Sequence, residues 1–421
     1  MENRLNRVMI RITLIFTFVM PAVLLNSMGI VILNLVNHMG VSKTAASWLE
    51  AFQGGSIIVG AFVFASFIPS IGYKKSMIIG IIFEIAACLL MWLMPSYAMA
   101  IVYYILCGLG FALVKTTIFA LVGLITDSPS QHASNISLLE GFFMISVLSG
   151  FWIYGFFMDN YTWTTTFIFL GFLCVLNLII VLLTFIDDSE VKTTGSSGKK
   201  STQIIKDIKS LIRLLWMPLV WLFVIVAFFY VFIEQGVNNW LPTFKTEVLC
   251  IDPALSVKVA SLFAGGLAVG RLLGSYIVRK ISWLYVLMGG LVIAFILLVS
   301  TIYFSQQVTL TGQVAKTWSE VPYVAYLIPL VGVCIAPIYP TVCSLVLSSQ
   351  PKRRQSSMAG LILFFSALGG TLGSNIIGRL FGIFGGLTAI KVPLVPMVII
   401  FIVLIPFYKV VTKIQKRKNN G

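Results

Sequence analysis

Twelve apolar runs, each long enough to cross a membrane, dominate this sequence of 421 residues. A helix needs about 20 apolar residues to span the hydrocarbon core of a bilayer. Within hydrocarbon the backbone must satisfy its own hydrogen bonds, which a helix does. The pattern therefore predicts an all-α membrane protein with twelve transmembrane helices. The runs are Ile10–Val36, Ala46–Phe67, Ser76–Met94, Ala98–Ile125, Ile136–Met158, Thr164–Ile186, Met217–Leu241, Val257–Val278, Trp283–Phe304, Val321–Leu347, Met358–Phe384 and Val392–Val411.

The composition supports this interpretation. Apolar residues make up 59% of the chain and charged residues 10%, whereas soluble domains contain about 45–50% and about 25%. A water-soluble enzyme, a disordered chain and a fibrous protein are excluded, because none of them hides so much apolar surface. Little of the chain remains outside the spans, so we expect short connections and no large extramembrane domain.

The net charge of +15 is explained by where the basic residues fall. With both termini inside the cell, 21 of the 29 Lys and Arg residues lie in cytoplasmic segments and five in outer ones, among them Lys245. Cytoplasmic segments of membrane proteins carry such an excess. We therefore expect a multi-pass protein of the inner (plasma) membrane with cytoplasmic termini, and no binding of nucleic acid.

The sequence divides into two halves around a polar stretch. We predict a six-helix bundle over 1–186, a cytoplasmic linker over 187–215 and a second six-helix bundle over 216–421. Glycines recur at an offset of 219 residues, with Gly141 matched to Gly360 and Gly150 to Gly369. Repeats of this kind build many secondary transporters, whose solute site lies near the midplane. The two bundles are therefore expected to be pseudo-symmetric.

The connection after the second run carries a recognisable motif. It reads Ala65-Ser-Phe-Ile-Pro-Ser-Ile-Gly-Tyr-Lys-Lys75 and resembles the Gly-x-x-x-Asp-Arg-x-Gly-Arg-Lys signature of the major facilitator superfamily. It keeps Gly72, Lys74 and Lys75 but has Pro69 and Ser70 in place of the Asp and the first Arg. The counterpart in the second half is Gly270-Arg-Leu-Leu-Gly274. The resemblance implies that Gly72, Lys74, Lys75 and Arg271 act in gating.

Three further segments are similar to the fucose–proton symporter family: Gly108-Leu-Gly-Phe-Ala-Leu-Val-Lys-Thr-Thr117, Glu140-Gly-Phe-Phe-Met-Ile145 and Ile335-Ala-Pro-Ile-Tyr-Pro340. The resemblance implies proton-coupled import by alternating access. The chain departs from that family at Lys115, since the sugar symporters tend to carry an acid or amide in this helix. They also tend to carry a carboxylate in the first helix, which has none here. These departures favour a solute other than a fucose-like sugar.

Lys115 is the sharpest site candidate because a charge inside a membrane is costly and is generally functional. It lies ten residues before the end of the fourth run, hence about 15 Å from the cytoplasmic edge. Phe111 and Phe119 share its face of the helix. Its ammonium needs a negative partner. That partner is either an anionic group of the solute or the carboxylate of Glu140 on the next helix.

A second candidate is the polar stripe formed by Tyr230, Glu234 and Asn238, which recur every four residues of the seventh run. Such a stripe should face water or solute rather than lipid. Gly236 and Pro242 predict that the helix opens there, as in half-helices that line transporter cavities. Glu234 is interpreted as a contact for the solute or for a proton.

The remaining polar residues within spans complete the candidate set. Further solute-binding candidates are Asn26, Gln53, Tyr339 and Asn375, and the proton-coupling candidates are Glu140, Glu234 and Glu84. Glu50 at the outer end of the second run is interpreted as a carboxylate solvated at the interface.

Motifs of enzymes and of ATP-driven pumps are missing from the sequence: it contains no GxxxxGK[ST], HExxH or GxSxG segment. The six cysteines lie mostly in apolar runs without a CxxC pair, so we expect neither a metal site nor a cofactor. We predict a monomeric secondary transporter whose partners are the lipid bilayer, protons and a small-molecule solute: an organic acid, a carboxylate-rich chelate or a sugar. The alternatives are an exporter of a metabolite or drug, and a solute sensor built on a transporter fold.

Overall fold

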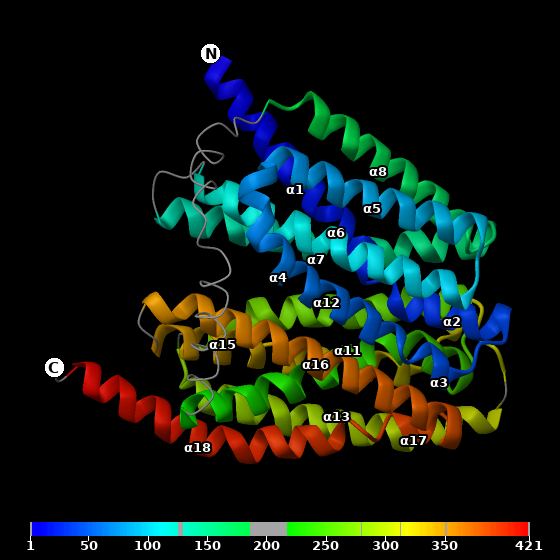
Figure 1. Ribbon diagram of the computed structural model, residues 1–421. Helices are drawn as coiled ribbons and strands as arrows, with labels where there is room; N and C mark the ends of the chain where they lie inside the picture. Colours follow the sequence, from blue (N-terminus) through cyan, green and yellow to red (C-terminus); the bar gives the residue numbers. More distant parts are fainter. Residues whose placement is uncertain are drawn as a thin grey trace. The chain divides into compact units, whose positions relative to one another are not determined.

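The computed structural model describes residues 2–124, 129–185, 217–278, 280–311, 313–349 and 352–419. Long helices fill these ranges, and the β-bridge found among them joins Ile251 to Ala315. Figure 1 shows the helices as extended rods joined by short connections. The predicted all-α class is confirmed. The predicted linker over 187–215 lies outside the described residues.

Among the described residues, the first part of the chain contains eight helices. They are α1 (Glu2–Leu25), α2 (Met28–Met39), α3 (Lys43–Ala46), α4 (Leu49–Ile71), α5 (Tyr73–Leu93), α6 (Tyr97–Leu124), α7 (Pro129–Asn160) and α8 (Thr165–Leu183). The later helices are α11 (Pro218–Glu247), α12 (Pro253–Ile277), α13 (Trp283–Thr311), α14 (Leu327–Ile335), α15 (Ile338–Ser349), α16 (Lys352–Phe384), α17 (Gly386–Ala389) and α18 (Leu394–Asn419), with two 3₁₀ turns, η1 (Trp318–Glu320) and η2 (Tyr323–Tyr326), before α14.

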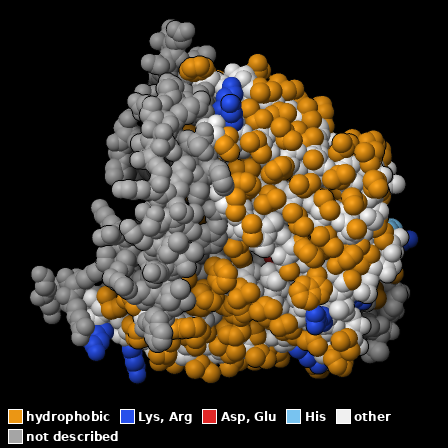
Figure 2. Space-filling view, viewed as in Figure 1, with side chains coloured by type: hydrophobic (Ala, Val, Ile, Leu, Met, Phe, Trp, Pro, Cys, Tyr) orange, Lys and Arg blue, Asp and Glu red, His pale blue; other side chains and the backbone are white. Residues whose placement is uncertain are grey.

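Helix occupies every one of the twelve predicted ranges. Ten segments of the described chain are long and apolar enough to cross a membrane, and α4 and α16 occupy the other two predicted ranges. Hydrophobic side chains cover most of the coloured surface in Figure 2, with Lys and Arg toward its margins. The protein is therefore a multi-pass membrane protein.

The chain forms two compact units. One contains Met1–Val41 and Phe52–Lys200, and the other contains Ser42–Ala51 and Ser201–Gly421. The short segment Ser42–Ala51 thus packs with the C-terminal helices, although the predicted bundle over 1–186 assigned it to the first half. In the first unit α5 packs on α6 and α8, and in the second α11 packs on α16 and α18.

Two of the transmembrane rods are interrupted. The first breaks between Leu25 and Met28, where the hydroxyl of Ser27 donates to the carbonyl of Leu24 at 2.6 Å. The second breaks between α14 and α15 at Pro337, which lacks the N–H that a continuous helix requires. The opening expected at Gly236 and Pro242 is not present in this structure, where α11 runs unbroken through both residues.

Glycine lets α11 approach α16 closely. A Cβ added to Gly373 would lie 2.8 Å from the Cα of Phe232, and one added to Gly236 would lie 3.1 Å from the carbonyl oxygen of Gly373. Small residues at such crossings permit backbone contact where no hydrophobic effect drives helices together. Gly236 therefore serves packing in this helix rather than flexibility.

We predict that Gly373→Ala destabilises the protein by about 1–3 kcal/mol, since an added methyl forces backbone shifts in a tightly packed region. The matched control is Gly289→Ala on α13, where an added Cβ meets no atom within 4 Å. That substitution should be neutral or stabilising, because alanine favours helix by up to about 1 kcal/mol. Thermal unfolding in detergent measures both, and equal shifts for the two variants would contradict the prediction.

Candidate functional site

The first unit surrounds Lys115 with aromatic rings. Its Nζ lies 5.3 Å from the ring centroids of Phe111 and Phe119 and 5.8 Å from that of Phe18. Phe18 in turn packs against Phe111, Phe119 and Phe143, with centroids 5.3–6.3 Å apart. Ring faces attract a cation at this range. The ammonium of this half-buried lysine is therefore held by α1 and its own helix α6 within an aromatic cluster.

The other predicted residues of this unit have varied surroundings. The Nδ2 of Asn26 donates to the Ala22 carbonyl of its own helix at 2.9 Å, beside the break between α1 and α2. Gln53 has a buried Oε1 that meets no hydrogen-bond donor among the described residues. The side chain of Glu140 lies outside the described residues, so the predicted Lys115–Glu140 pair stays a prediction.

Glu84 is fully buried in α5. Its Oε2 lies 4.0 Å from the Sγ of Cys174 on α8, and its Oε1 meets no hydrogen-bond donor in the described chain. Gly110 on α6 leaves room for it, since a Cβ there would lie 3.3 Å from the Cγ of Glu84. The carboxyl group thus lies where α5, α6 and α8 meet, and its proton-coupling role stays a prediction.

The second unit contains an ion pair within its membrane helices. The Nη2 of Arg271 on α12 donates to the Oε1 of Glu234 on α11 at 2.8 Å. The side chains are 27% and 13% exposed, respectively, so water reaches the pair only partly. The sequence placed these residues in different roles, Glu234 at the solute or proton site and Arg271 at the gate. The structure brings them together.

Two tyrosines lie beside this pair. The rings of Tyr230 and Tyr339 stack with centroids 5.5 Å apart, and the hydroxyl of Tyr339 lies 3.0 Å from that of Ser366 on α16. Tyr230 is fully buried, next to both charges of the ion pair. Its hydroxyl has no hydrogen-bond partner of good geometry among the described residues.

An amide-rich cluster continues along α11 and α16. The Nδ2 of Asn239 donates to the Oε2 of Glu50 at 2.8 Å and lies 3.3 Å from the Oγ of Ser374. Predicted Asn375 donates to the Oγ of Ser47 at 3.1 Å. Predicted Asn238 is also buried. The interpretation of Glu50 as a solvated carboxylate is wrong, because its residue is only 7% exposed.

Sequence reasoning missed Asn239, Ser366 and Ser374. Asn239 stands next to a predicted residue in the Asn238-Asn239 pair, so its amide was a detectable signal. The two serines of α16 give no such signal, since small polar residues occur throughout the spans. Their relevance follows from the contacts alone.

The residues of the motif after the second run tie helices together. Gly72 has φ +95° at the start of α5, a conformation that L side chains rarely adopt. The Nζ of Lys74 donates to the carbonyls of Leu182 and Thr184 at 2.8 and 2.9 Å, at the end of α8. A cation there complements the negative end of the helix. Lys75 is exposed. The gating role of the three residues stays a prediction.

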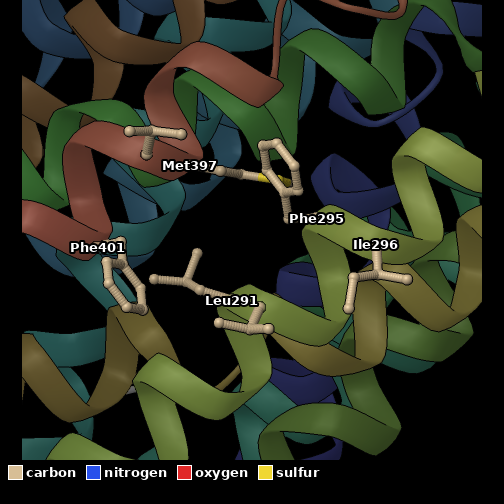
Figure 3. Close-up of a pocket in the computed structure, with 7 residues that line it drawn as sticks. Leu291, Phe295, Ile296, Met397 and Phe401 are labelled. Atoms are coloured by element: carbon tan, nitrogen blue, oxygen red, sulfur yellow. The ribbon is translucent and has the colours of Figure 1, made fainter.

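An apolar cavity of about 220 Å³ lies between α13 and α18. Figure 3 shows Leu291, Phe295 and Ile296 from α13 opposite Met397 and Phe401 from α18. None of the predicted site residues lines it, and the lining side chains offer no hydrogen-bonding groups. We therefore do not regard it as the site of a polar solute.

The family follows from comparison with known proteins. Residues 13–374 match the family model of the Major Facilitator Superfamily. The chain therefore belongs to the major facilitator superfamily, and the prediction of a transporter rather than an enzyme is confirmed.

The relatives are distant. The chain is 22% identical over 372 residues to a "Protein TsgA homolog" of Buchnera aphidicola subsp. Schizaphis graminum, covering 88% of each chain. It is 22% identical over 341 residues to the "Glucose/mannose transporter GlcP" of Bacillus subtilis (strain 168), covering 78% of this chain and 77% of the relative.

Solved structures share the fold. The nucleoside transporter NupG aligns with a TM-score of 0.74 at 11% identity, over 96% of this chain and 100% of its own. The peptide transporter POT in complex with sulfate aligns with a TM-score of 0.70 at 12% identity, over 96% of this chain and 95% of its own. At these identities the likeness establishes the fold and not the solute.

We predict that Glu234 and Arg271 are energetically coupled. Glu234→Gln, Arg271→Gln and the double variant should give a coupling of roughly 0.5–3 kcal/mol in unfolding free energy, since each single change leaves one charge without its partner. The comparison cycle combines Arg271→Gln with Glu320→Gln. Glu320 is an exposed residue whose carboxylate accepts from the backbone N–H groups of Lys316 and Thr317. Effects in that cycle should add, and additivity in both cycles would refute the coupling.

Proposed function

We propose that this transporter imports a small polar or anionic solute together with protons, by alternating access in the inner membrane and with both termini cytoplasmic. The observation that carries the proposal is the Glu234–Arg271 ion pair, at 2.8 Å between two membrane helices and beside the buried hydroxyl of Tyr230. Charges within a membrane are costly and are kept where they act. A pair that can be opened by one proton is suited to coupling.

Protonation of Glu234 removes the negative charge that holds Arg271. The guanidinium then presents its planar donors to another acceptor, and a carboxylate of the solute matches them in geometry. When the proton leaves, Glu234 competes again for Arg271 and the solute is released. Proton and solute thus bind the same state more strongly, which is the requirement for shifting an equilibrium between two conformations.

Lys115 is the proposed contact for an anionic group in the first unit. Three aromatic rings surround its ammonium at 5.3–5.8 Å, and ring faces attract a cation at this range. A carboxylate of the solute gains charge-assisted hydrogen bonds from such a group. An organic acid or a carboxylate-rich chelate therefore fits these residues better than a neutral molecule.

A neutral sugar is the second candidate solute. The Bacillus relative is named a glucose/mannose transporter, and the hydroxyls of Tyr230 and Tyr339 and the amide of Asn238 are suited to bonding sugar hydroxyls. Thermal-shift screening of the purified carrier against sugars, organic acids and carboxylate-rich chelates separates the two classes. The best ligand then enters uptake assays.

The test of the whole proposal is uptake in proteoliposomes with and without a proton gradient. An inward proton gradient, with the more acidic solution outside the vesicles, should drive accumulation of the solute above its external concentration. Vesicles that accumulate nothing from a broad solute panel under either condition would favour a sensor. Accumulation only with the reversed gradient would indicate an exporter.

We predict that Lys115→Met lowers uptake of an anionic solute by roughly 30-fold or more, since losing one partner of a buried charge pair costs about 2 kcal/mol or more. Lys115→Arg should retain part of the uptake because it keeps the charge. Lys391→Met, which removes an exposed lysine before α18, is the control and should transport normally. Unchanged uptake by a folded Lys115→Met carrier would show that Lys115 does not bind the solute.

We predict that Glu234→Gln uncouples transport from protons. The amide cannot release or take up a proton, so an acid-outside gradient should no longer drive accumulation beyond equilibrium. Exchange of labelled for unlabelled solute needs no net proton movement and should persist. Gradient-driven accumulation at the unsubstituted level would assign proton coupling to another carboxyl group, such as Glu84 or Glu140.

A further inference from the structure

A ten-residue segment of the N-terminal half is packed entirely among C-terminal helices. Residues Ser42–Ala51 belong to the second unit, whereas Val41 and Phe52 on either side belong to the first. The segment contains α3 and the first turn of α4. We call Ser42–Ala51 the docked segment. Because the residues on both sides of it belong to the first unit, the docked segment must leave α11 and α16 whenever this packing changes.

Polar contacts fix the docked segment at three places. The Nζ of Lys43 pairs with Glu247 of α11 at 2.6 Å and lies 4.7 Å from the ring centroid of Phe381. The Oγ of Ser47 accepts from Asn375 at 3.1 Å. The guanidinium of Arg379 lies 5.3 Å from the ring centroid of Trp48. The docking surface on α11 and α16 is therefore polar and specific.

Glu50 forms the fourth and most buried contact. Its residue is 7% exposed, and its Oε2 accepts from the Nδ2 of Asn239 at 2.8 Å. Asn239 is itself positioned by Ser374, whose carbonyl accepts from the indole N–H of Trp240 at 2.9 Å. The carboxyl group of Glu50 is thus held by the side-chain amide of Asn239, which is itself held in place by contacts with α16.

The other charged side chains of this docking surface have partners other than Glu50. Lys43 of the docked segment pairs with Glu247 of α11, and Arg379 of α16 lies over Trp48. Within the described chain, no Lys or Arg forms an ion pair with Glu50, whose hydrogen-bond partner is the uncharged Asn239. A buried carboxylate without a cation is costly, whereas a neutral carboxyl group accepts the same amide hydrogen bond at little cost.

We propose that Glu50 is a further proton site of this carrier: it is protonated when the segment Ser42–Ala51 is docked on α11 and α16, and it loses the proton when the segment is released. The direction in which this proton moves across the membrane rests on the proposed function. The link between docking and protonation does not, since it follows from the packing of the second unit alone.

The sign of the effect follows from linkage. The docked state binds one proton more than the released state, so low pH favours docking and rising pH favours release. One linked proton changes the ratio of the two states by at most about tenfold per pH unit. The dependence disappears at pH values where Glu50 is protonated, or ionised, in both states.

A disulfide trap measures docking. A Cβ added to Gly382 would lie 3.5 Å from the Cβ of Lys43, within the range that a disulfide requires. In purified carrier bearing Lys43→Cys and Gly382→Cys, the initial rate of cross-linking by an added oxidant reports how often the segment is docked. Each rate is divided by that of the same pair with Glu50→Gln, which corrects for the pH dependence of thiol oxidation.

The normalised rate should fall by several-fold up to about tenfold per pH unit as pH rises through the transition. Glu50→Gln mimics the neutral carboxyl group, which is why it serves as the reference for this ratio. Glu320→Gln, on an exposed carboxylate, is the matched control and should keep the pH dependence of the parent. A normalised rate that does not change with pH would overturn the proposal.

A second variant tests the same group without removing it. Asn239→Asp places another carboxyl beside Glu50, and two close carboxyl groups share a proton up to higher pH. The docked state then holds a further proton that the released state loses, so the release transition should become steeper and move to lower pH. A transition with the parent midpoint and steepness would also overturn the proposal. Uptake assays keep the two hypotheses apart: pH-linked docking without solute uptake refutes only the proposed function, and uptake with pH-independent docking refutes only the role of Glu50.

Discussion

The structure depends on one constraint: within hydrocarbon, each backbone N–H and C=O must find its partner in the protein itself. That constraint turns the apolar runs into long helices and leaves irregular backbone only where side chains complete the hydrogen bonding. At the break in the first rod, Ser27 bonds the carbonyl of Leu24 and lies near the hydroxyl of Tyr104. The break before α15 places Tyr339 beside Tyr230. The hydroxyl of Tyr339 also lies 3.0 Å from that of Ser366, so both of these breaks lie near a polar side-chain contact.

The same environment governs the charged side chains inside the helices. Lys74 is bonded to the end of α8, and Arg271 is paired with Glu234. Lys245, expected in an outer segment, is fully buried and donates to the carbonyl of Val259 at 2.7 Å. Lys115 lies among rings. These cations differ in the kind of partner they have: a backbone carbonyl cannot change its charge, whereas the carboxylate of Glu234 can. That difference is why we propose a functional role for the Glu234–Arg271 pair.

Hydrophobic periodicity and length predicted the helices well, because the cost of exposing backbone to lipid is large and depends on local sequence. The sequence also identified Tyr230 and Glu234 as functional candidates from their polarity, and Arg271 from its place in the motif that resembles the family signature. It did not predict that Glu234 and Arg271 are paired, because the pairing depends on how α11 and α12 cross. Nor did it predict that α11 is unbroken at Gly236, which packs closely against Gly373 of α16.

The burial of Glu50 was harder still to foresee. A carboxylate in the first turn of a helix is ordinarily solvated, whereas Glu50 is buried in the segment Ser42–Ala51 that packs with the second unit. This docking gives α11 a particular place in the proposed mechanism. Glu234 and Asn239, which bonds Glu50, lie five residues apart on that helix, about 7.5 Å along its axis. A shift of α11 that strained the Glu234–Arg271 pair would also move the partner of Glu50. We therefore expect the two proposed proton sites to be coupled through α11, without a further side-chain pathway.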